Sequence, residues 1–356
     1  MDENPIFFDF SKLKPSGFHY VAVDFSLPYS LHVSEDSYDV DVSVGKNQLR
    51  VQLFLENRWR NQNRRTDFPL VVGERIERFA DVDGAYRYTT IKVFIPVRSE
   101  RSGVPQDIEA TWKKVSQDRY WYRDLAIQAT NRLLEIYRFC AKEPHIKALT
   151  GRELKFDFRF VLLFNQNHSD ATSSNFTVKI SPTTYWGDMY PSFQNVPNVV
   201  EEDLRNRLKS HFQVPLAENL ILNAYEHIAQ GNYRLAIIET ETAFEAAVHE
   251  FLQSFYIQDP NMLSEIERLN RDGFTNVVKS RKLRPAFNGK KFTDNVPEFE
   301  SWRKKVMELR NQLVHGKKEV VTKQEAIDAI NTIEQVLSFL LARAITKPYQ
   351  FLEVSS

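Results

Sequence analysis

The chain has 356 residues, of which 42% are apolar, so it is long enough for about two domains with cores of their own. Lys plus Arg and Asp plus Glu number 47 each, and a net charge of zero means that any nucleic-acid-binding surface must be local. The single cysteine, Cys140, excludes an intramolecular disulfide framework and a cysteine-based zinc site, and it suits a reducing compartment.

The N-terminal stretch MDENPIFFDF is acidic and lacks the basic region and apolar run of a signal peptide. The chain also has no run of about 18 uninterrupted apolar residues, so we expect no membrane span. These features predict a cytoplasmic protein that does not contact a membrane.

The first part of the chain is predicted to form mainly strands. After a strand at FHYVAVDF (18–25), apolar and polar residues alternate in YDVDVSV (38–44) and LRVQLFL (49–55), and the short turn GKNQ joins the two. This pattern predicts an antiparallel hairpin. Further strands are predicted over residues 86–97, 154–164 and 175–180.

One long helix, predicted over 118–142, interrupts these strands. Its apolar positions recur every three or four residues and include Cys140, which we expect to be a small core residue rather than a nucleophile. Because helices and strands do not alternate regularly, a doubly wound parallel sheet is disfavoured. We predict an α+β domain with a mostly antiparallel sheet over residues 1–198.

Residues 181–198 contain three prolines and a glycine without periodicity, which predicts a linker or surface loop. Beyond it the strand patterns give way to helical periodicity. We expect short helices at 201–213 and 216–229, and longer ones at 231–256, 298–315 and 323–345. Residues 199–356 are therefore predicted to form an all-α bundle of about four or five helices.

Several common catalytic signatures are missing from the sequence. The chain has no G-x-x-x-x-G-K-[ST] phosphate loop, no H-E-x-x-H and no G-x-S-x-G. No two of its eight histidines lie within four residues of each other. A local two-histidine metal site is therefore excluded, although a site assembled in space is not.

The remaining cluster of chemical interest is ELRNQLVHGKKE, at the end of a predicted helix. At about 100° per residue, Arg310 lies about 40° from Val306, at the edge of the apolar seam, while Asn311 and His315 share a face. Gly316 is suited to the position just beyond the helix end. An ordinary helix terminus explains the same residues, since Arg310 and His315 favour the negative end of the helix dipole.

Glu241 lies on the upstream helix GNYRLAIIETETAFEAAVHEFL, about 40° from Ile237 and close to the apolar seam. A carboxylate near a seam needs a cationic or hydrogen-bonding partner, and Arg310 is available across the bundle. The alternative is a partly exposed position for Glu241 at the edge of the seam.

With these residues in view, the C-terminal 140 or so residues, about 40% of the chain, resemble a HEPN domain. HEPN domains form a helical superfamily of nucleotide-associated ribonucleases with the signature R-x-x-x-x-H, matched here by RNQLVHG (310–316). The resemblance implies a catalytic site of Arg310, Asn311 and His315. Many members also carry an acidic residue followed four positions later by a basic one. Here Glu241 is followed by Glu245, so Glu241 is carried over only as a supporting residue.

The resemblance implies a metal-independent, cofactor-free endoribonuclease in which a ribose 2′-OH attacks the neighbouring phosphate. Histidine suits proton transfer because its ordinary pKa is about 6.5, and a guanidinium stabilises charge on the phosphoryl oxygens. Asn311 would orient His315 or donate to phosphate. Because one motif supplies one histidine, a mechanism with two proton transfers predicts a homodimer through the helical domain, and products with 2′,3′-cyclic phosphate ends.

By the same resemblance, the expected setting is antiviral defence through abortive infection, or a toxin–antitoxin system. Residues 1–198 would then sense a trigger or select the substrate, and a trigger or antitoxin would bind there. The alternative is a non-catalytic HEPN-type module for dimerisation or for binding nucleotide or RNA. Intact Arg310 and His315 favour the enzyme, while the missing acid-to-base element favours the module.

Two basic clusters are candidate RNA-binding surfaces. Residues 277–305 hold nine basic side chains against three acidic ones, and RWRNQNRR (58–65) mixes four arginines with Trp59. The simpler explanation for residues 277–305 is a solvated surface, and for residues 58–65 it is the end of a hairpin. The basic candidates are Lys279, Arg281, Lys282, Arg284, Lys290, Lys291, Arg303, Lys304, Lys305, Arg58, Arg60, Arg64 and Arg65.

Overall fold

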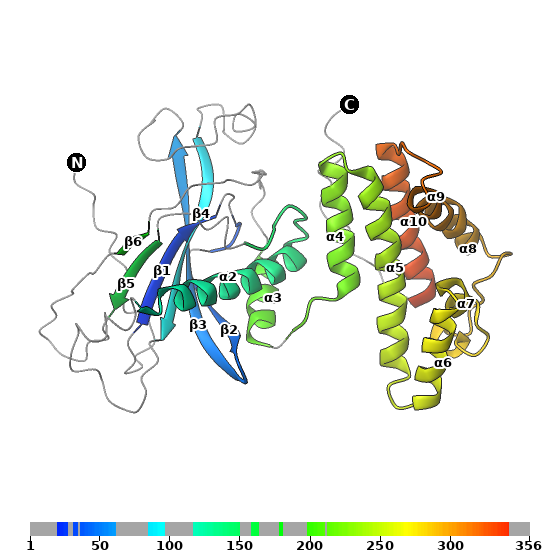
Figure 1. The fold of residues 1–356 in the computed structure, drawn as a ribbon, viewed down its shortest axis with the longest axis horizontal. Coiled ribbons are helices and arrows are strands. Elements are labelled where there is room, and N and C mark those ends of the chain that lie inside the picture. The colour runs from blue at the N-terminus through cyan, green and yellow to red at the C-terminus, as the bar shows by residue number, and fades with distance from the viewer. Residues whose placement is uncertain are drawn as a thin grey trace, which may run out of the picture. The chain divides into compact units, whose positions relative to one another are not determined.

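The computed structural model divides the chain into two compact units (Figure 1). The first comprises residues 1–140 and 147–212, and the second comprises 141–146 and 213–356. The structure describes residues 20–27, 31–34, 36–61, 85–96, 117–149, 158–163, 178–180, 198–210 and 212–341. The linker predicted over 181–198 lies outside these ranges except for its last residue, which begins a helix.

The described strands of the first unit form a six-stranded sheet in the order β2-β3-β4-β1-β5-β6, with every neighbouring pair antiparallel. This confirms the predicted α+β class and the antiparallel sheet. The strands are β1 (Tyr20–Ser26), β2 (Ser37–Val44), β3 (Asn47–Asn61), β4 (Ala85–Pro96), β5 (Phe158–Leu163) and β6 (Val178–Ile180).

The predicted hairpin is formed by β2 and β3. Val44 pairs with Asn47, so Gly45 and Lys46 make a two-residue turn. Gly45 has φ +60°, which glycine adopts without steric cost at the first position of such a turn. Tyr38 and Val40 are buried at alternate positions, as the period-two pattern requires. The strand β3 continues beyond the predicted end, as far as Asn61.

The long predicted helix is α2 (Arg119–Ala141), which runs across the sheet in Figure 1. Its inner side chains are buried, and the hydroxyl of Tyr137 accepts the backbone N–H of His32 at 3.1 Å. Cys140 lies at the edge of the buried face of α2. It is half-buried, and its thiol donates to the carboxylate of Asp203 at 3.3 Å. Asp203 belongs to α3 (Asn198–Lys209), a helix of the same unit.

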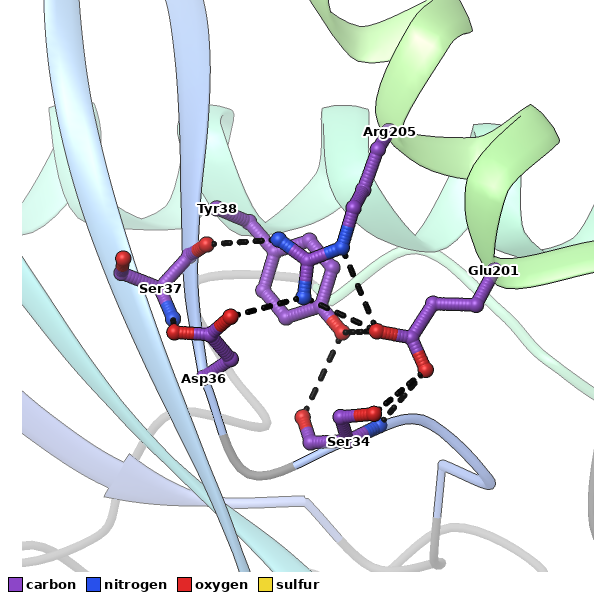
Figure 2. A network of polar contacts seen from close by, with 6 residues as sticks. All are labelled: Ser34, Asp36, Ser37, Tyr38, Glu201 and Arg205. Carbon is purple, nitrogen blue, oxygen red and sulfur yellow. Dashed lines mark hydrogen bonds and ion pairs between the residues drawn. The ribbon is translucent and has the colours of Figure 1, made fainter. Parts of the chain in front are cut away.

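Figure 2 shows how α3 is attached to the start of β2. The guanidinium of Arg205 lies 4.2 Å from the centre of the Tyr38 ring and donates to the carbonyl of Ser37 at 3.1 Å. The same group pairs with Asp36 at 3.2 Å and with Glu201, one turn earlier on α3, at 2.8 Å. One arginine therefore joins α3 to the β2 strand by stacking, hydrogen bonding and ion pairing.

Glu201 also attaches α3 to the residues before and at the start of β2. Its carboxylate accepts the backbone N–H of Ser34 at 3.0 Å, the Ser34 hydroxyl at 2.7 Å and the Tyr38 hydroxyl at 3.1 Å. Burial alone would raise the pKa of Glu201, but the hydrogen bonds from Ser34, Arg205 and Tyr38 outweigh it, and the pKa is lowered. The carboxylate form is thus the one that holds α3 in place.

The described part of the second unit consists of helices joined by loops and contains no strand. Its core lies around α5, which packs against α4 and α10, and includes a buried aromatic cluster with Phe244 only 5.4 Å from Trp302 between ring centres. The helices are α4 (Leu216–Ala229), α5 (Tyr233–Phe255), α6 (Pro260–Arg271), α7 (Phe274–Lys279), η3 (Arg284–Phe287), α8 (Pro297–Trp302), η4 (Arg303–Met307), α9 (Glu308–Val314) and α10 (Lys323–Leu341).

The predicted helices of this unit are found, and α4 has the predicted bounds. Three further segments, α6, α7 and η3, were not predicted. In α6 a single residue, Ile266, is buried, so the apolar signal is weak, although Asp259 caps the helix by accepting from two backbone N–H groups. None of the described helices combines the length and apolar character needed to cross a bilayer.

Candidate active site

The helix that carries the RNQLVHG motif begins at Pro297 and ends at Val314. Proline suits the first helical position, and Glu298 and Glu300 in the first turn suit the positive end of the helix dipole. At the other end, the N–H of Gly316 donates to Leu313 and that of Lys317 to Gln312, in a Schellman arrangement. Gly316 has φ +66°, so the predicted role of this glycine beyond the helix end is confirmed.

The three motif side chains lie on the last two turns of this helix. Arg310 is half-buried, and its Nη1 donates to the Oδ1 of the half-buried Asn311 at 3.1 Å. His315 caps the end of α9 and is exposed, and its backbone N–H donates to the carbonyl of Asn311 at 3.0 Å. The structure therefore joins Arg310 to Asn311 directly and presents the His315 imidazole to solvent one turn later.

Glu241 is buried in the helical core with 3% of its surface exposed. Its direct partner is Trp302, whose indole Nε1–H donates to the carboxyl at 2.8 Å. Burial raises the pKa of Glu241 to about 8; the Trp302 hydrogen bond lowers it, the Glu245 charge raises it and the Arg310 guanidinium lowers it. Arg310, the partner expected from the sequence, thus acts on Glu241 through its charge, while Trp302 makes the hydrogen bond.

Glu245, one turn after Glu241 on α5, makes the second carboxyl near Arg310. Burial raises the pKa of Glu245, and the Arg310 guanidinium lowers it. Within the described part of the chain, neither carboxyl is paired with the guanidinium at ion-pair distance, and the buried Nε of Arg310 has no hydrogen-bond partner. A half-buried cation that is close to two acids and incompletely bonded is a candidate partner for an anionic ligand, but the buried Nε itself is not accessible to one.

Most of the basic cluster over 277–305 is engaged with neighbouring groups. Lys279 pairs with Asp294 at 3.0 Å, Lys282 with Glu265 at 3.0 Å, and Arg303 and Lys304 with Glu300 at 2.9 and 3.5 Å, while Lys290 donates to the carbonyl of Phe339. These pairs reduce the net positive charge of the surface. Four side chains have no such pair among the described residues, namely Arg281, Arg284, Lys291 and Lys305.

The second basic cluster is only partly described. Arg58 and Arg60 lie within β3, opposite Tyr88 and Tyr86 of β4, so this segment is a continuation of the strand rather than the hairpin end. Arg64 and Arg65 lie outside the described residues.

A polar groove of about 270 Å³ lies beside the motif helix. It combines lysine side chains with carboxylates of the first turns of α10, and Lys318 is already paired with Glu325. The lining residues are Lys304, Lys305, Leu309, Gln312, Lys318, Glu325 and Asp328. Arg310 is not among them, so the groove and the guanidinium are separate features of this helix.

The sequence interpretation missed two members of the cluster, Trp302 and Glu245. Trp302 follows the apolar spacing of the predicted helix over 298–315, which by itself indicates a plain core residue. An indole N–H buried in a helix seam nevertheless requires an acceptor, and this requirement points to a polar residue such as Glu241 on the facing helix. Glu245 was noted only as a departure from the family pattern. A further feature not predicted is the π turn between Trp302 and Glu308.

Within the described ranges, no group of three or more His, Cys, Asp or Glu side chains has a metal-binding arrangement. The chain was compared with family models, with curated proteins and with solved structures. None of the three comparisons gives a match.

Proposed function

We propose that the helical unit is a HEPN-type endoribonuclease that cleaves RNA without a metal ion or cofactor, at a site shared between two copies of the chain. One observation carries the proposal: α9 ends with a half-buried Arg310 that is bonded to Asn311, and with an exposed His315 one turn later. This arrangement supplies a cation and an exposed imidazole within about one and a half helical turns.

The chemistry follows from these two groups. A base removes the proton of the ribose 2′-OH, the oxygen attacks the adjacent phosphorus, and the bond to the 5′-oxygen breaks as an acid protonates that oxygen. Histidine is a common general base or general acid, and the exposed His315 is the candidate for this role in each chain. Arg310 stabilises the charge that gathers on the phosphoryl oxygens. The products are a 2′,3′-cyclic phosphate and a 5′-hydroxyl.

A second copy supplies the second proton-transfer group, because each chain contributes one His315. Two exposed valines lie near this histidine in the sequence, Val314 directly before it with 53% of its surface exposed and Val320 five positions later with 75%. Exposed apolar side chains next to a polar group are typical of protein interfaces. This surface supports a homodimer in which two Arg310–His315 sets share one cleft.

The proposed setting is that of an effector in antiviral defence by abortive infection, or of a toxin, acting in the cytoplasm. The sheet-containing unit would then sense a trigger, select the substrate or bind an antitoxin. Growth arrest after expression in a bacterial host, relieved by His315→Ala, would support this setting. Unaltered growth with a catalytically active protein would contradict a toxin role.

A second candidate function is a non-catalytic HEPN-type module that dimerises or binds nucleotide or RNA. It is favoured by Glu245, an acid near Arg310 at the position where the family resemblance has a base. Negative charge close to a guanidinium weakens its attraction for a phosphate. In this case Arg310 would serve the fold of the bundle more than catalysis.

Cleavage of single-stranded RNA in the presence of EDTA distinguishes the two functions. We expect the purified protein to cut RNA to 2′,3′-cyclic phosphate ends, and His315→Ala to abolish the cutting. His249→Ala is the matched control, because His249 lies on α5 and contacts Gln253 at 3.1 Å. Cleavage that survives His315→Ala would show that the site is wrongly assigned, and RNA binding without cleavage would favour the module.

A further inference from the structure

The motif helix is α-helical on both sides of a single π turn. The helix α8 ends at Trp302, η4 spans Arg303–Met307, and α9 begins at Glu308. The N–H of Glu308 donates to the carbonyl of Arg303, five residues earlier, so this turn contains one residue more than an α-helical turn. Such π turns are rare and are found frequently at functional sites.

The extra residue decides which side chains share a face of the helix. Arg310 follows Trp302 by eight residues, and an uninterrupted α-helix would place them about 80° apart around the axis. With one residue absorbed by the π turn, the effective separation is about seven residues, and the two side chains lie within about 20°. Leu309 is turned about 120° away from Trp302 by the same change.

The surroundings of these side chains agree with this register. Trp302 donates to Glu241 on α5, and although burial raises the pKa of Glu241 and Glu245, the guanidinium of Arg310 lowers both. Leu309 instead lines the polar groove. The apolar pattern alone would equally suit a straight helix, because three- and four-residue spacings separate Phe299, Trp302, Val306, Leu309 and Leu313.

We propose that the π turn is a positioning device, which brings Arg310 into line with Trp302 and holds its guanidinium near the acidic pair Glu241 and Glu245. Without the turn, Leu309 would occupy that part of the helix face and the guanidinium would point away from it. The catalytic consequence rests on the proposed nuclease function, whereas the register is a property of the helix and can be tested without RNA.

Deletion of Lys304, an exposed residue of the π turn, tests this register. The shortened segment can be α-helical throughout while Arg310, now seven residues after Trp302, keeps its direction. If the wild-type helix were straight, the same deletion would rotate Arg310 by about 100° relative to Trp302. Lys304→Ala removes the same side chain at constant length and is the matched control.

The readout is the electrostatic coupling between Arg310 and Glu241. The fluorescence of Trp302, obtained as the difference between each protein and its Trp302→Phe form, follows the ionisation of the carboxyl to which the indole donates. Arg310→Gln removes a positive charge and therefore moves the midpoint of this titration to higher pH. We expect the same upward shift in the wild-type, Lys304→Ala and Lys304-deletion backgrounds.

The proposal is overturned if Arg310→Gln does not shift the midpoint of the Trp302 fluorescence titration in the deletion variant. It is also overturned if Arg310→Gln does not shift this midpoint in the wild-type background. If the Lys304 deletion does not fold, deletion of the exposed neighbour Lys305 repeats the test. Failure of both deletions to fold also overturns it, because a helix already in this register accepts the shorter turn.

RNA cleavage by the same variants separates the register from the proposed function. We expect the deletion variant to cleave within about threefold of Lys304→Ala. Absence of cleavage in every variant, with the expected titrations, would reject the nuclease and leave the register intact. A large loss of cleavage in the deletion variant alone, with the titration unchanged, would show that the π turn does more than orient Arg310 and would overturn the positioning role.

Discussion

Replacing Glu241 with glutamine removes an ionisable proton from the helical core with almost no change in shape. In the folded protein, burial raises the pKa of Glu241 from 4.5 to about 8, against the opposing hydrogen bond from Trp302. An acid with a raised folded-state pKa binds more protons when folded than when unfolded between those two values. The stability associated with the neutral carboxyl is therefore complete below about pH 4.5 and is lost as the pH rises through about 8.

The size of the effect follows from the separation of the two pKa values. Each pKa unit corresponds to about 1.4 kcal/mol. Between a pH well below 4.5 and a pH well above 8, ionisation of the buried carboxyl therefore lowers the free energy of unfolding by roughly 5 kcal/mol. An amide at this position keeps an acceptor for the indole of Trp302 and has no proton to lose. We expect Glu241→Gln to be nearly as stable as the wild type at low pH, and more stable by a few kcal/mol above pH 8.

Urea unfolding at about pH 5, 6.5 and 8, followed by helical circular dichroism, measures this difference. Glu267→Gln, at an exposed position of α6, is the control and is expected to change the unfolding free energy by less than about 0.5 kcal/mol at each pH. A difference between wild type and Glu241→Gln that is the same at pH 5 and pH 8 would refute the reasoning. It would mean that this carboxyl ionises as easily in the folded chain as in the unfolded one.

The remaining predictions concern the attachment of α3 and the end of α9. Glu201→Gln should destabilise the first unit by about 1–3 kcal/mol at neutral pH, because a neutral amide pairs less well with Ser34 and Arg205. Since hydrogen bonds lower the pKa of Glu201, its contribution is present above about pH 4.5 and is lost as the pH falls through the lowered value. Urea unfolding of Glu202→Gln, exposed on the same helix, gives the comparison, and equal effects of the two changes would contradict the network. Gly316→Ala should cost about 1 kcal/mol in thermal unfolding because φ is +66°, with a smaller loss for Gly316→Asn. Equal losses would argue against the left-handed conformation.

Local features of the fold were predictable because their causes lie within a few residues of sequence. Alternating residues such as Tyr38 and Val40, followed by a glycine turn, predicted the β2–β3 hairpin, since each strand must bury one face. The helical periodicity of residues 216–229 predicted α4 with its bounds. Gly316 predicted the end of α9, because glycine adopts the left-handed conformation required there.

The residues that surround Arg310 could be identified only from the folded structure. Glu241 and Trp302 lie 61 residues apart in the chain, and only the packing of α5 against the motif helix makes one the hydrogen-bond partner of the other. The π turn was also invisible in the sequence, because the apolar spacing suits a straight helix as well.

The sequence by itself determined the class of the fold, the positions of most helices and strands, and the motif Arg310, Asn311 and His315 as the residues to consider. Apolar periodicity and turn-forming residues involve positions that are close in the sequence, so they can be recognised in a single sequence. Tertiary structure decided the strand order, with β1 between β4 and β5, and the burial of Glu241 beside Trp302 and Arg310. Strand pairing and the pKa of a buried acid depend on groups that are distant in sequence and meet only when the core has formed.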